Sequence, residues 1–160
     1  MSGIIKPFWS AKDYKSGVYK VIKNPYNNFS TDPANKKRYK NVNVYANYDV
    51  PQKFYSLVEK FNIEKAVLVL NKMPPGQIFP FHVDKCRTYI KKNKIKTKEK
   101  IERIIVFLDA SEPGHQLWIN DKICVGGPGS FFQWSYGTRH MAANLGEKDR
   151  YTLQITGVKK

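Results

Sequence analysis

From Lys65 onward the chain consists mainly of short apolar segments, many of them alternating with polar residues. Their lengths, and the Gly, Pro or Asn residues between them, are typical of β-strands. The predicted strands are KAVLVLNK (65–72), QIFPFHV (77–83), IERIIVFL (101–108), HQLWIND (115–121), KICVGG (122–127), GSFFQWS (129–135), TRHMAANL (138–145) and RYTLQITG (150–157). About eight strands without helices between them predict a mainly β protein, either a closed barrel or a two-sheet jelly roll.

The first 64 residues predict fewer strands and one clear helix. The strands are GVYKVIKN (17–24) and NVNVYANY (41–48), and a long polar loop joins them over residues 24–40. The segment DVPQKFYSLVEKFN (49–62) predicts a helix, with Asp49 as its cap and Pro51 in its first turn. One face of this helix is apolar and consists of Phe54, Leu57, Val58 and Phe61. We expect this helix to pack on the barrel.

Length and composition allow one sizeable core, because 41% of the 160 residues are hydrophobic. We therefore expect a single domain over residues 1–160, with the barrel core at about 65–158 and residues 1–64 as its support. The only cysteines, Cys86 and Cys124, are too few for a disulfide framework and indicate a reducing compartment. Neither a signal peptide nor an apolar run long enough for a membrane span is apparent, so we expect a cytoplasmic protein with no membrane partner.

The chain is strongly basic, with 28 Lys and Arg residues against 13 Asp and Glu residues. A formal charge of +15 suits an anionic partner, such as a nucleic acid, an acidic protein or a small carboxylate, although surface lysines also serve solubility. Six of the lysines lie in KKNKIKTKEK (91–100), which predicts an exposed loop or a basic arm on the substrate side. One function to weigh is therefore a basic nucleic-acid-binding module on a barrel scaffold.

A histidine and an aspartate, His82 and Asp84, stand two positions apart on a predicted strand, where period-2 alternation places both on one face. His140 follows on a separate predicted strand. Two imidazoles and one carboxylate can bind one side of an Fe(II) ion and leave its other positions open. The remaining histidine, His115, has no comparable partner in the sequence and is expected in a loop or at the start of a strand.

An arginine follows ten residues after His140. Arg150, Thr152 and Gln154 share one face of their predicted strand. An arginine fork matches a carboxylate in two contacts, and a hydroxyl two residues away can add a hydrogen bond. The ordered set therefore combines a metal site with an anchor for a small carboxylate.

This order, H-x-D, then a distal His, then R-x-T, resembles the Fe(II)/2-oxoglutarate-dependent oxygenases of the double-stranded β-helix fold. Within that superfamily the chain resembles the small prolyl- and aspartyl/asparaginyl-hydroxylase-like proteins. The resemblance covers about residues 65–158 and is carried by PPGQIFPFHVDKCR, GSFFQWSYGTRHMAANLG and RYTLQITG. The last two blocks are similar to stand-alone oxygenases of bacterial and phage genomes, so the cytoplasm of a bacterial or phage-infected cell is the expected location.

The resemblance implies a double-stranded β-helix, jelly-roll and cupin-like, that uses Fe(II) and 2-oxoglutarate, with ascorbate as a candidate reductant. It implies His82, Asp84 and His140 as iron ligands, and Arg150 with Thr152 as the anchor for the far carboxylate of 2-oxoglutarate. The implied reaction is hydroxylation of a peptide, protein or amino-acid substrate, with release of succinate and carbon dioxide.

Two details of the sequence bear on the substrate. Arg87 is expected near the mouth of the barrel, where it could contact an acidic substrate. The nucleic-acid repair branch of these oxygenases usually has a second arginine six positions after the first, whereas Thr156 stands there in this chain. A nucleic acid is therefore a weaker expectation than a peptide or an amino acid.

A cupin-like metal enzyme that uses no 2-oxoglutarate is the other function to weigh. Such a site more often has a fourth protein ligand, and the sequence offers no evident one. Arg150 is the residue that separates these two hypotheses.

Overall fold

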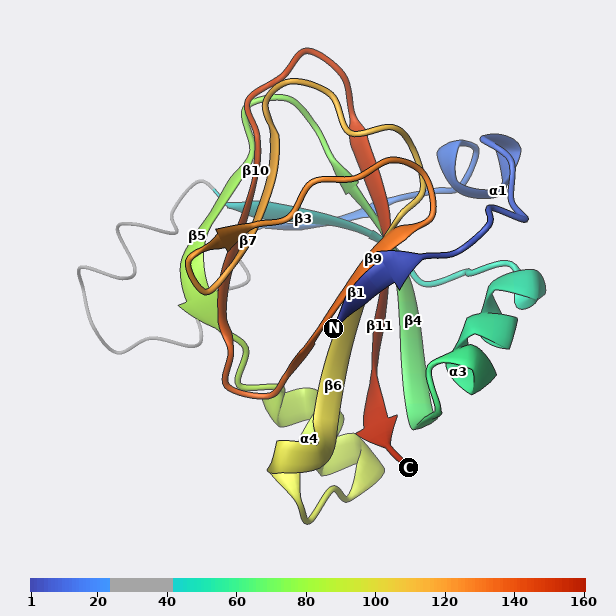
Figure 1. The fold of residues 1–160 in the computed structure, drawn as a ribbon, viewed down its shortest axis with the longest axis vertical. Coiled ribbons are helices and arrows are strands. Elements are labelled where there is room, and N and C mark those ends of the chain that lie inside the picture. The colour runs from blue at the N-terminus through green and yellow to red at the C-terminus, as the bar shows by residue number, and fades with distance from the viewer. Residues whose placement is uncertain (24–41) are drawn as a thin grey trace.

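The computed structural model describes residues 1–23 and 42–160 (Figure 1), so the loop predicted over residues 24–40 lies outside the described residues. The strands are β1 (Ser2–Ile4), β2 (Lys20–Lys23), β3 (Asn43–Asn47), β4 (Ile63–Met73), β5 (Ile78–Val83), β6 (Ile101–Phe107), β7 (His115–Ile119), β8 (Lys122–Ile123), β9 (Ser130–Ser135), β10 (Arg139–Asn144) and β11 (Arg150–Lys159). The helical segments are α1 (Lys12–Lys15), η1 (Gln52–Tyr55), α3 (Ser56–Lys60), α4 (Arg87–Asn93) and η2 (Lys98–Lys100). Every predicted strand is confirmed, with boundaries that differ by a few residues.

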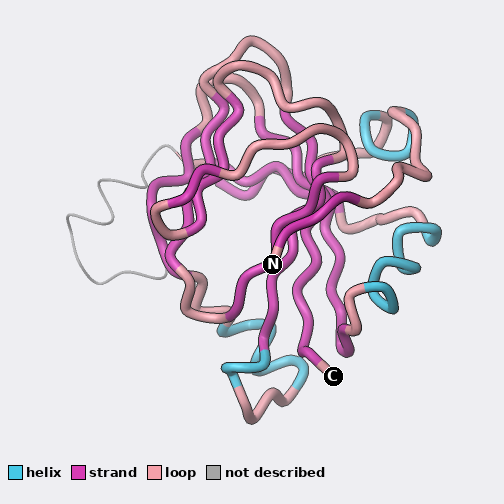
Figure 2. The backbone as a smooth tube through the Cα atoms, viewed as in Figure 1, coloured by secondary structure: helices cyan, strands magenta, loops and turns pink. Residues whose placement is uncertain are grey.

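The described strands form two antiparallel sheets. The larger sheet has the order β1-β9-β6-β11-β4-β3-β2, and the smaller has the order β5-β10-β7-β8. The two N-terminal strands predicted from the sequence, β2 and β3, extend one edge of the larger sheet beside β4. Figure 2 shows the helical segments at the periphery of the strands.

Alternation along β11 divides the larger sheet into two faces. Tyr151, Leu153 and Ile155 belong to the main hydrophobic cluster, whereas Arg150 and Thr152 line a pocket on the opposite face. Neighbouring strands follow the same rule, since successive side chains of a strand point to opposite faces. One face of the sheet therefore holds the main core and the other forms a wall of the pocket.

The expected N-terminal helix packs on the outer face of the larger sheet. Phe54, Leu57 and Phe61 are buried in the main cluster beside Leu70 and Leu153 of the sheet. Burying one such side chain contributes about 1.5–3 kcal/mol.

This helix is shorter than the predicted span of residues 49–62. Pro51 has an extended ψ of 136°, and Asn62, with φ of 54°, is in the left-handed region. Between them the chain forms the 3-10 turn η1 and then α3. The expected side-chain cap from Asp49 is not formed at either helix start.

The basic segment after β5 is more ordered than predicted. The expectation over residues 91–100 was a loop or an arm, but α4 extends to Asn93 and η2 spans Lys98–Lys100. The left-handed residues Cys86 and Lys94 flank α4. Lysine is a good helix former, and the charge run obscured the helical spacing of Arg87, Ile90 and Lys91.

None of the helices in the described ranges has the length and apolar character needed to cross a membrane.

Candidate metal centre

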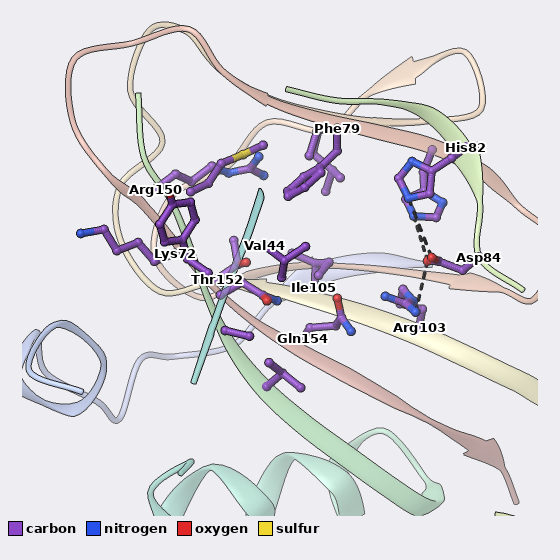
Figure 3. Close-up of a pocket in the computed structure, with 18 of the residues that line it drawn as sticks. Val44, Lys72, Phe79, His82, Asp84, Arg103, Ile105, Arg150, Thr152 and Gln154 are labelled. Carbon is purple, nitrogen blue, oxygen red and sulfur yellow. Dashed lines mark ion pairs between the residues drawn. The ribbon is translucent and has the colours of Figure 1, made fainter. Parts of the chain in front are cut away.

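The pairing of β5 with β10 brings the three predicted ligands together. His82 and His140 are register partners across this antiparallel pair, and Asp84 directly follows β5. One ligand atom from each of the three residues lies within 4.8 Å of the others. Figure 3 shows His82 and Arg103 on either side of the carboxylate of Asp84. The structure thus brings residues that are up to 58 positions apart into one cluster.

Each imidazole is held by its own strand. Nδ1 of His82 lies 2.7 Å from the carbonyl oxygen of Pro80, and Nδ1 of His140 lies 3.0 Å from that of Thr138. Because a carbonyl oxygen only accepts, Nδ1 must carry the proton in each ring. In the neutral form of each ring the lone pair then lies on Nε2, the atom that faces Asp84 and could bind a metal. Such backbone contacts are the usual outer support of metal-binding histidines.

The carboxylate of Asp84 lies close to the guanidinium of Arg103 and to both imidazoles. Its Oδ2 lies 3.1 Å from Nε2 of His140 and 3.1 Å from Nη2 of Arg103, and its Oδ1 lies 3.8 Å from Nε2 of His82. Burial by itself would raise the pKa of Asp84, but Arg103 and the two imidazoles lower it well below its usual range. The carboxylate of Asp84 is therefore ionised at any ordinary pH.

The imidazole of His82 is favoured in its neutral form. Burial, together with the neighbouring ring of His140, lowers the pKa of His82 below its ordinary value. A metal ligand must be deprotonated, so both the neutral imidazole and the ionised carboxylate suit a divalent cation. The set of two nitrogen donors and one carboxylate fits Fe(II) in particular.

A cavity of about 260 Å³ lies between the sheets, and all three predicted ligands line it. Its apolar lining includes Val44, Phe79 and Ile105, which Figure 3 shows between the histidine cluster and Arg150. Trp134 also lines the cavity, and its ring centroid lies 5.0 Å from that of His140. The three candidate metal-binding residues thus face a largely apolar cavity.

Arg150 and Thr152 line the same cavity, and both are buried. Only 7% of Arg150 is exposed, and its Nη1 donates a hydrogen bond of 2.7 Å to the carbonyl oxygen of Gln116. Its guanidinium carbon lies 5.0 Å from the ring centroid of Phe107. Burial lowers the pKa of Arg150 to about 10, so the side chain remains a cation at neutral pH. Within the described part of the chain, no carboxylate forms an ion pair with it.

Two other residues considered from the sequence lie away from this cavity. Arg87 is exposed at the start of α4 and lines a separate hollow. The chain turns at Cys86, whose φ is 45°, and this turn takes Arg87 off the face of β5. His115 lies at the start of β7, as expected, with Nε2 3.1 Å from the carbonyl oxygen of Lys148.

Sequence reasoning missed Arg103. It lies on β6, on the same face as Ile105, and lines the cavity beside Asp84. The signal that could have identified it is a single charge among Ile101, Ile105 and Phe107 on one face of β6, because a buried charge requires a partner.

No model of a known protein family matches the chain, and no curated protein sequence matches it. Among solved structures it is similar to a predicted oxalate decarboxylase from Thermotoga maritima, with a TM-score of 0.52 and 15% identity over 91% of this chain and 96% of that chain. A cupin protein from Bacteroides fragilis gives a TM-score of 0.43 and 14% identity over 64% of this chain and 73% of that chain. A protein with a double-stranded β-helix domain from Klebsiella pneumoniae gives a TM-score of 0.42 and 14% identity over 62% of this chain and 70% of that chain.

The sheet topology and the first of these likenesses confirm the expected fold class, which is mainly β with a double-stranded β-helix of the cupin type. At 15% identity the likeness concerns the fold alone. The residues that line the cavity are therefore the evidence for the reaction that this protein could catalyse.

Proposed function

We propose that this protein is an Fe(II)- and 2-oxoglutarate-dependent dioxygenase that hydroxylates a C–H bond of a peptidyl or amino-acid substrate. In this reaction one atom of dioxygen enters the substrate as a hydroxyl group. The other enters succinate, which forms from 2-oxoglutarate with loss of carbon dioxide. The bound iron supplies the redox chemistry that side chains lack, and the protein supplies position and environment.

The observation that carries this proposal is the burial of Arg150 without a carboxylate partner among the described residues. It is a buried cation, its cavity also contains the metal cluster, and no described carboxylate neutralises it. An unpaired buried charge is costly, and a ligand carboxylate would remove that cost. A guanidinium binds a carboxylate through two parallel hydrogen bonds, and the neighbouring hydroxyl of Thr152 can add a third.

The arrangement suits a ligand with two acidic ends. Figure 3 shows Arg150 and Thr152 at one end of the cavity and the cluster of His82 and Asp84 at the other. The far carboxylate of 2-oxoglutarate would bind Arg150, and its 2-oxo acid end would meet the metal held by His82, Asp84 and His140. The apolar side chains between these ends would exclude water from the middle of the ligand.

The other residues around the cluster have positioning roles in this proposal. Arg103 holds the carboxylate of Asp84 at 3.1 Å and so limits its rotation. The carbonyl oxygens of Pro80 and Thr138 fix the two imidazoles. Trp134 packs against His140 and limits solvent on that side.

A cupin-type metal enzyme that uses no 2-oxoglutarate is the second candidate, because the three metal-binding residues by themselves fit it equally well. Within residues 1–23 and 42–160, the cluster has three potential ligands and no fourth His, Cys, Asp or Glu. A three-residue cluster leaves more positions for a chelating co-substrate, which favours the dioxygenase.

Succinate release tests the proposal. The purified protein is incubated with Fe(II), ascorbate, 2-oxoglutarate and pools of candidate peptides, and succinate is measured. The wild-type protein should release succinate, His140→Ala should release none, and Arg150→Ala should release much less at 2-oxoglutarate concentrations that do not saturate the variant. If no succinate forms, and Mn(II)-loaded wild-type protein does not bind 2-oxoglutarate, the cupin-type alternative becomes the better assignment.

A further inference from the structure

A second hollow, of about 400 Å³, lies outside the metal cavity and is ringed by cations. Lys85, Arg87, Lys91 and Lys98 line it together with Ile90 and Tyr136. The four cations are exposed, whereas the side chains of Ile90 and Tyr136 are partly buried. The basic segment after β5 is therefore folded around a concave site and is not a plain extended arm.

Five of the six residues that line the hollow lie within residues 85–98, and the sixth, Tyr136, comes from a distant part of the chain. Lys85 follows β5, Arg87 and Lys91 belong to α4, and Lys98 belongs to η2. Tyr136 comes from the turn between β9 and β10. In Figure 1, α4 lies at the end of the barrel next to the lower end of β6.

This grouping of cations has no internal counter-charge. Residues 85–100 contain eight basic residues and one acidic residue, Glu99. None of the four cations of the hollow forms an ion pair within the part of the chain that the structure describes. Arg87 and Lys91 repel each other at i and i+4 on α4, and Arg87 lies at the helix end where a cation is unfavourable. Stability of α4 does not explain these positions, whereas an anionic partner does.

The hollow is also adjacent to the metal cluster. Asp84, His140 and Tyr136 all line one small cavity, and Tyr136 also lines the hollow. Lys85 is the next residue after the metal ligand Asp84. A chain bound in the hollow would therefore lie beside the metal centre.

We propose that this hollow binds an acidic segment of a peptide, and that the segment flanks the residue to be hydroxylated. Three of the four cations are lysines, which suit separate carboxylates as point charges. The hollow has one aromatic ring, and that ring is partly buried, whereas single-stranded nucleic acids bind on series of exposed aromatic faces. That the bound peptide is a substrate rests on the proposed function; that it binds does not.

The test measures binding to the full-length protein without metal or 2-oxoglutarate. A fluorescein-labelled oligoglutamate peptide is titrated and followed by fluorescence anisotropy, with a labelled oligothymidylate of equal charge as the comparison. The hollow variant combines Lys85→Ser, Arg87→Ser, Lys91→Ser and Lys98→Ser. The control variant loses the same charge at four exposed lysines elsewhere, through Lys6→Ser, Lys60→Ser, Lys122→Ser and Lys160→Ser.

The hollow variant should bind the peptide about tenfold more weakly than wild type, and the control variant should stay within about twofold, because exposed ion pairs each contribute little. An equal loss of peptide affinity in both variants would show that binding depends only on the overall charge of the protein. That result would overturn the proposal. So would an absence of peptide binding, or tighter binding of oligothymidylate through the same four residues.

Photocrosslinking makes the result independent of whether the hollow variant folds. An oligoglutamate peptide with a benzophenone group is irradiated with wild-type protein, and the attachment sites are found by mass spectrometry. Attachment within residues 85–100 or at Tyr136 supports the proposal, and attachment elsewhere overturns it. If the peptide binds in the hollow but Arg150→Ala leaves 2-oxoglutarate binding unchanged, the proposed function fails while the acidic-peptide site stands.

Discussion

His82 and His140 are register partners on β5 and β10, and their ring centroids lie 4.4 Å apart. Each ring also places its Nδ1 on the carbonyl oxygen two residues earlier in its own strand. Two adjacent strands therefore hold their imidazoles through the same kind of backbone contact. With Asp84 beside them, backbone pairing sets the geometry of the candidate metal site.

Loss of either histidine should remove metal binding. Changes to groups that merely support a metal ligand cost about 10- to 100-fold in affinity, so His82→Ala or His140→Ala should weaken Mn(II) binding by at least about 100-fold. Isothermal titration with Mn(II) measures this. His115→Ala is the matched control, because His115 lies outside the cluster, and it should bind Mn(II) normally. Unchanged affinity in both cluster variants would refute the metal assignment.

Loss of the negative charge at Asp84 should be at least as harmful. Asp84→Asn keeps the shape of the side chain but removes the only carboxylate of the cluster, and Asp84→Ala removes it entirely. We expect Mn(II) affinity to fall by at least about 100-fold in both variants. Asp109→Asn is the control, since Asp109 pairs with Lys15 at 2.6 Å and is not in the cluster. Normal Mn(II) affinity in Asp84→Asn would mean that the metal needs no anionic ligand here.

Arg150 should govern binding of 2-oxoglutarate and not of the metal. A charge-assisted contact of this kind contributes about 2–3 kcal/mol, so Arg150→Ala should weaken 2-oxoglutarate binding by about 30- to 150-fold. Arg150→Lys should restore binding only in part, because lysine keeps the charge but lacks the fork. Displacement of 2-oxoglutarate from Mn(II)-loaded protein measures both variants. Equal binding by wild type and Arg150→Ala would favour the cupin-type alternative.

Arg103→Gln should reveal the ion pair with Asp84 through the pH dependence of stability. Arg103 lowers the pKa of Asp84 in the folded state, so the pair stabilises the fold above the ordinary pKa of 3.8. That stabilisation is lost as the pH falls through the depressed folded pKa. Urea unfolding in the presence of EDTA should show a cost of about 1–3 kcal/mol at pH 7. The difference between wild type and variant should shrink only below about pH 4. A difference that is constant down to pH 2 would contradict this account.

Asn144 should be a stability determinant of the loop that leads to Arg150. It is fully buried, its Nδ2 donates to the carbonyl oxygens of Met73 and Lys148, and its Oδ1 accepts from the backbone N–H of Gly146. Asn144→Ala leaves these backbone groups without their partner and should cost about 3 kcal/mol. Urea unfolding measures the loss. A cost below about 1 kcal/mol would show that other groups replace these hydrogen bonds.

The sequence predicted the strands well because their patterns are local. In β11, for example, Arg150, Thr152 and Gln154 alternate with Tyr151 and Leu153, and all three polar residues line the cavity. The ordered positions of the metal-binding residues were equally visible. Their assigned roles in binding iron and 2-oxoglutarate, and that of Arg87 in binding substrate, stay predictions.

What the sequence did not predict depends on tertiary contacts. Arg103 seemed an ordinary residue of IERIIVFL, and only the packing of β6 against the segment after β5 pairs it with Asp84. The short elements β1 and α1 have three and four residues, too few to show a period. The basic run that supplies most of the hollow was visible in the sequence, but its folding into a concave site that includes the distant Tyr136 was not.

Successive side chains of β11 point alternately into the main core and into the cavity, so a single strand carries two different constraints. Substitutions at Tyr151, Leu153 or Ile155 act on the main core, whereas substitutions at Thr152 or Gln154 change what the cavity can accept. Adjacent codons are therefore under different constraints, and the ligand preference of the barrel can diverge while its folding free energy is conserved. A mutant library restricted to alternate positions would change specificity and retain most of its members as folded protein.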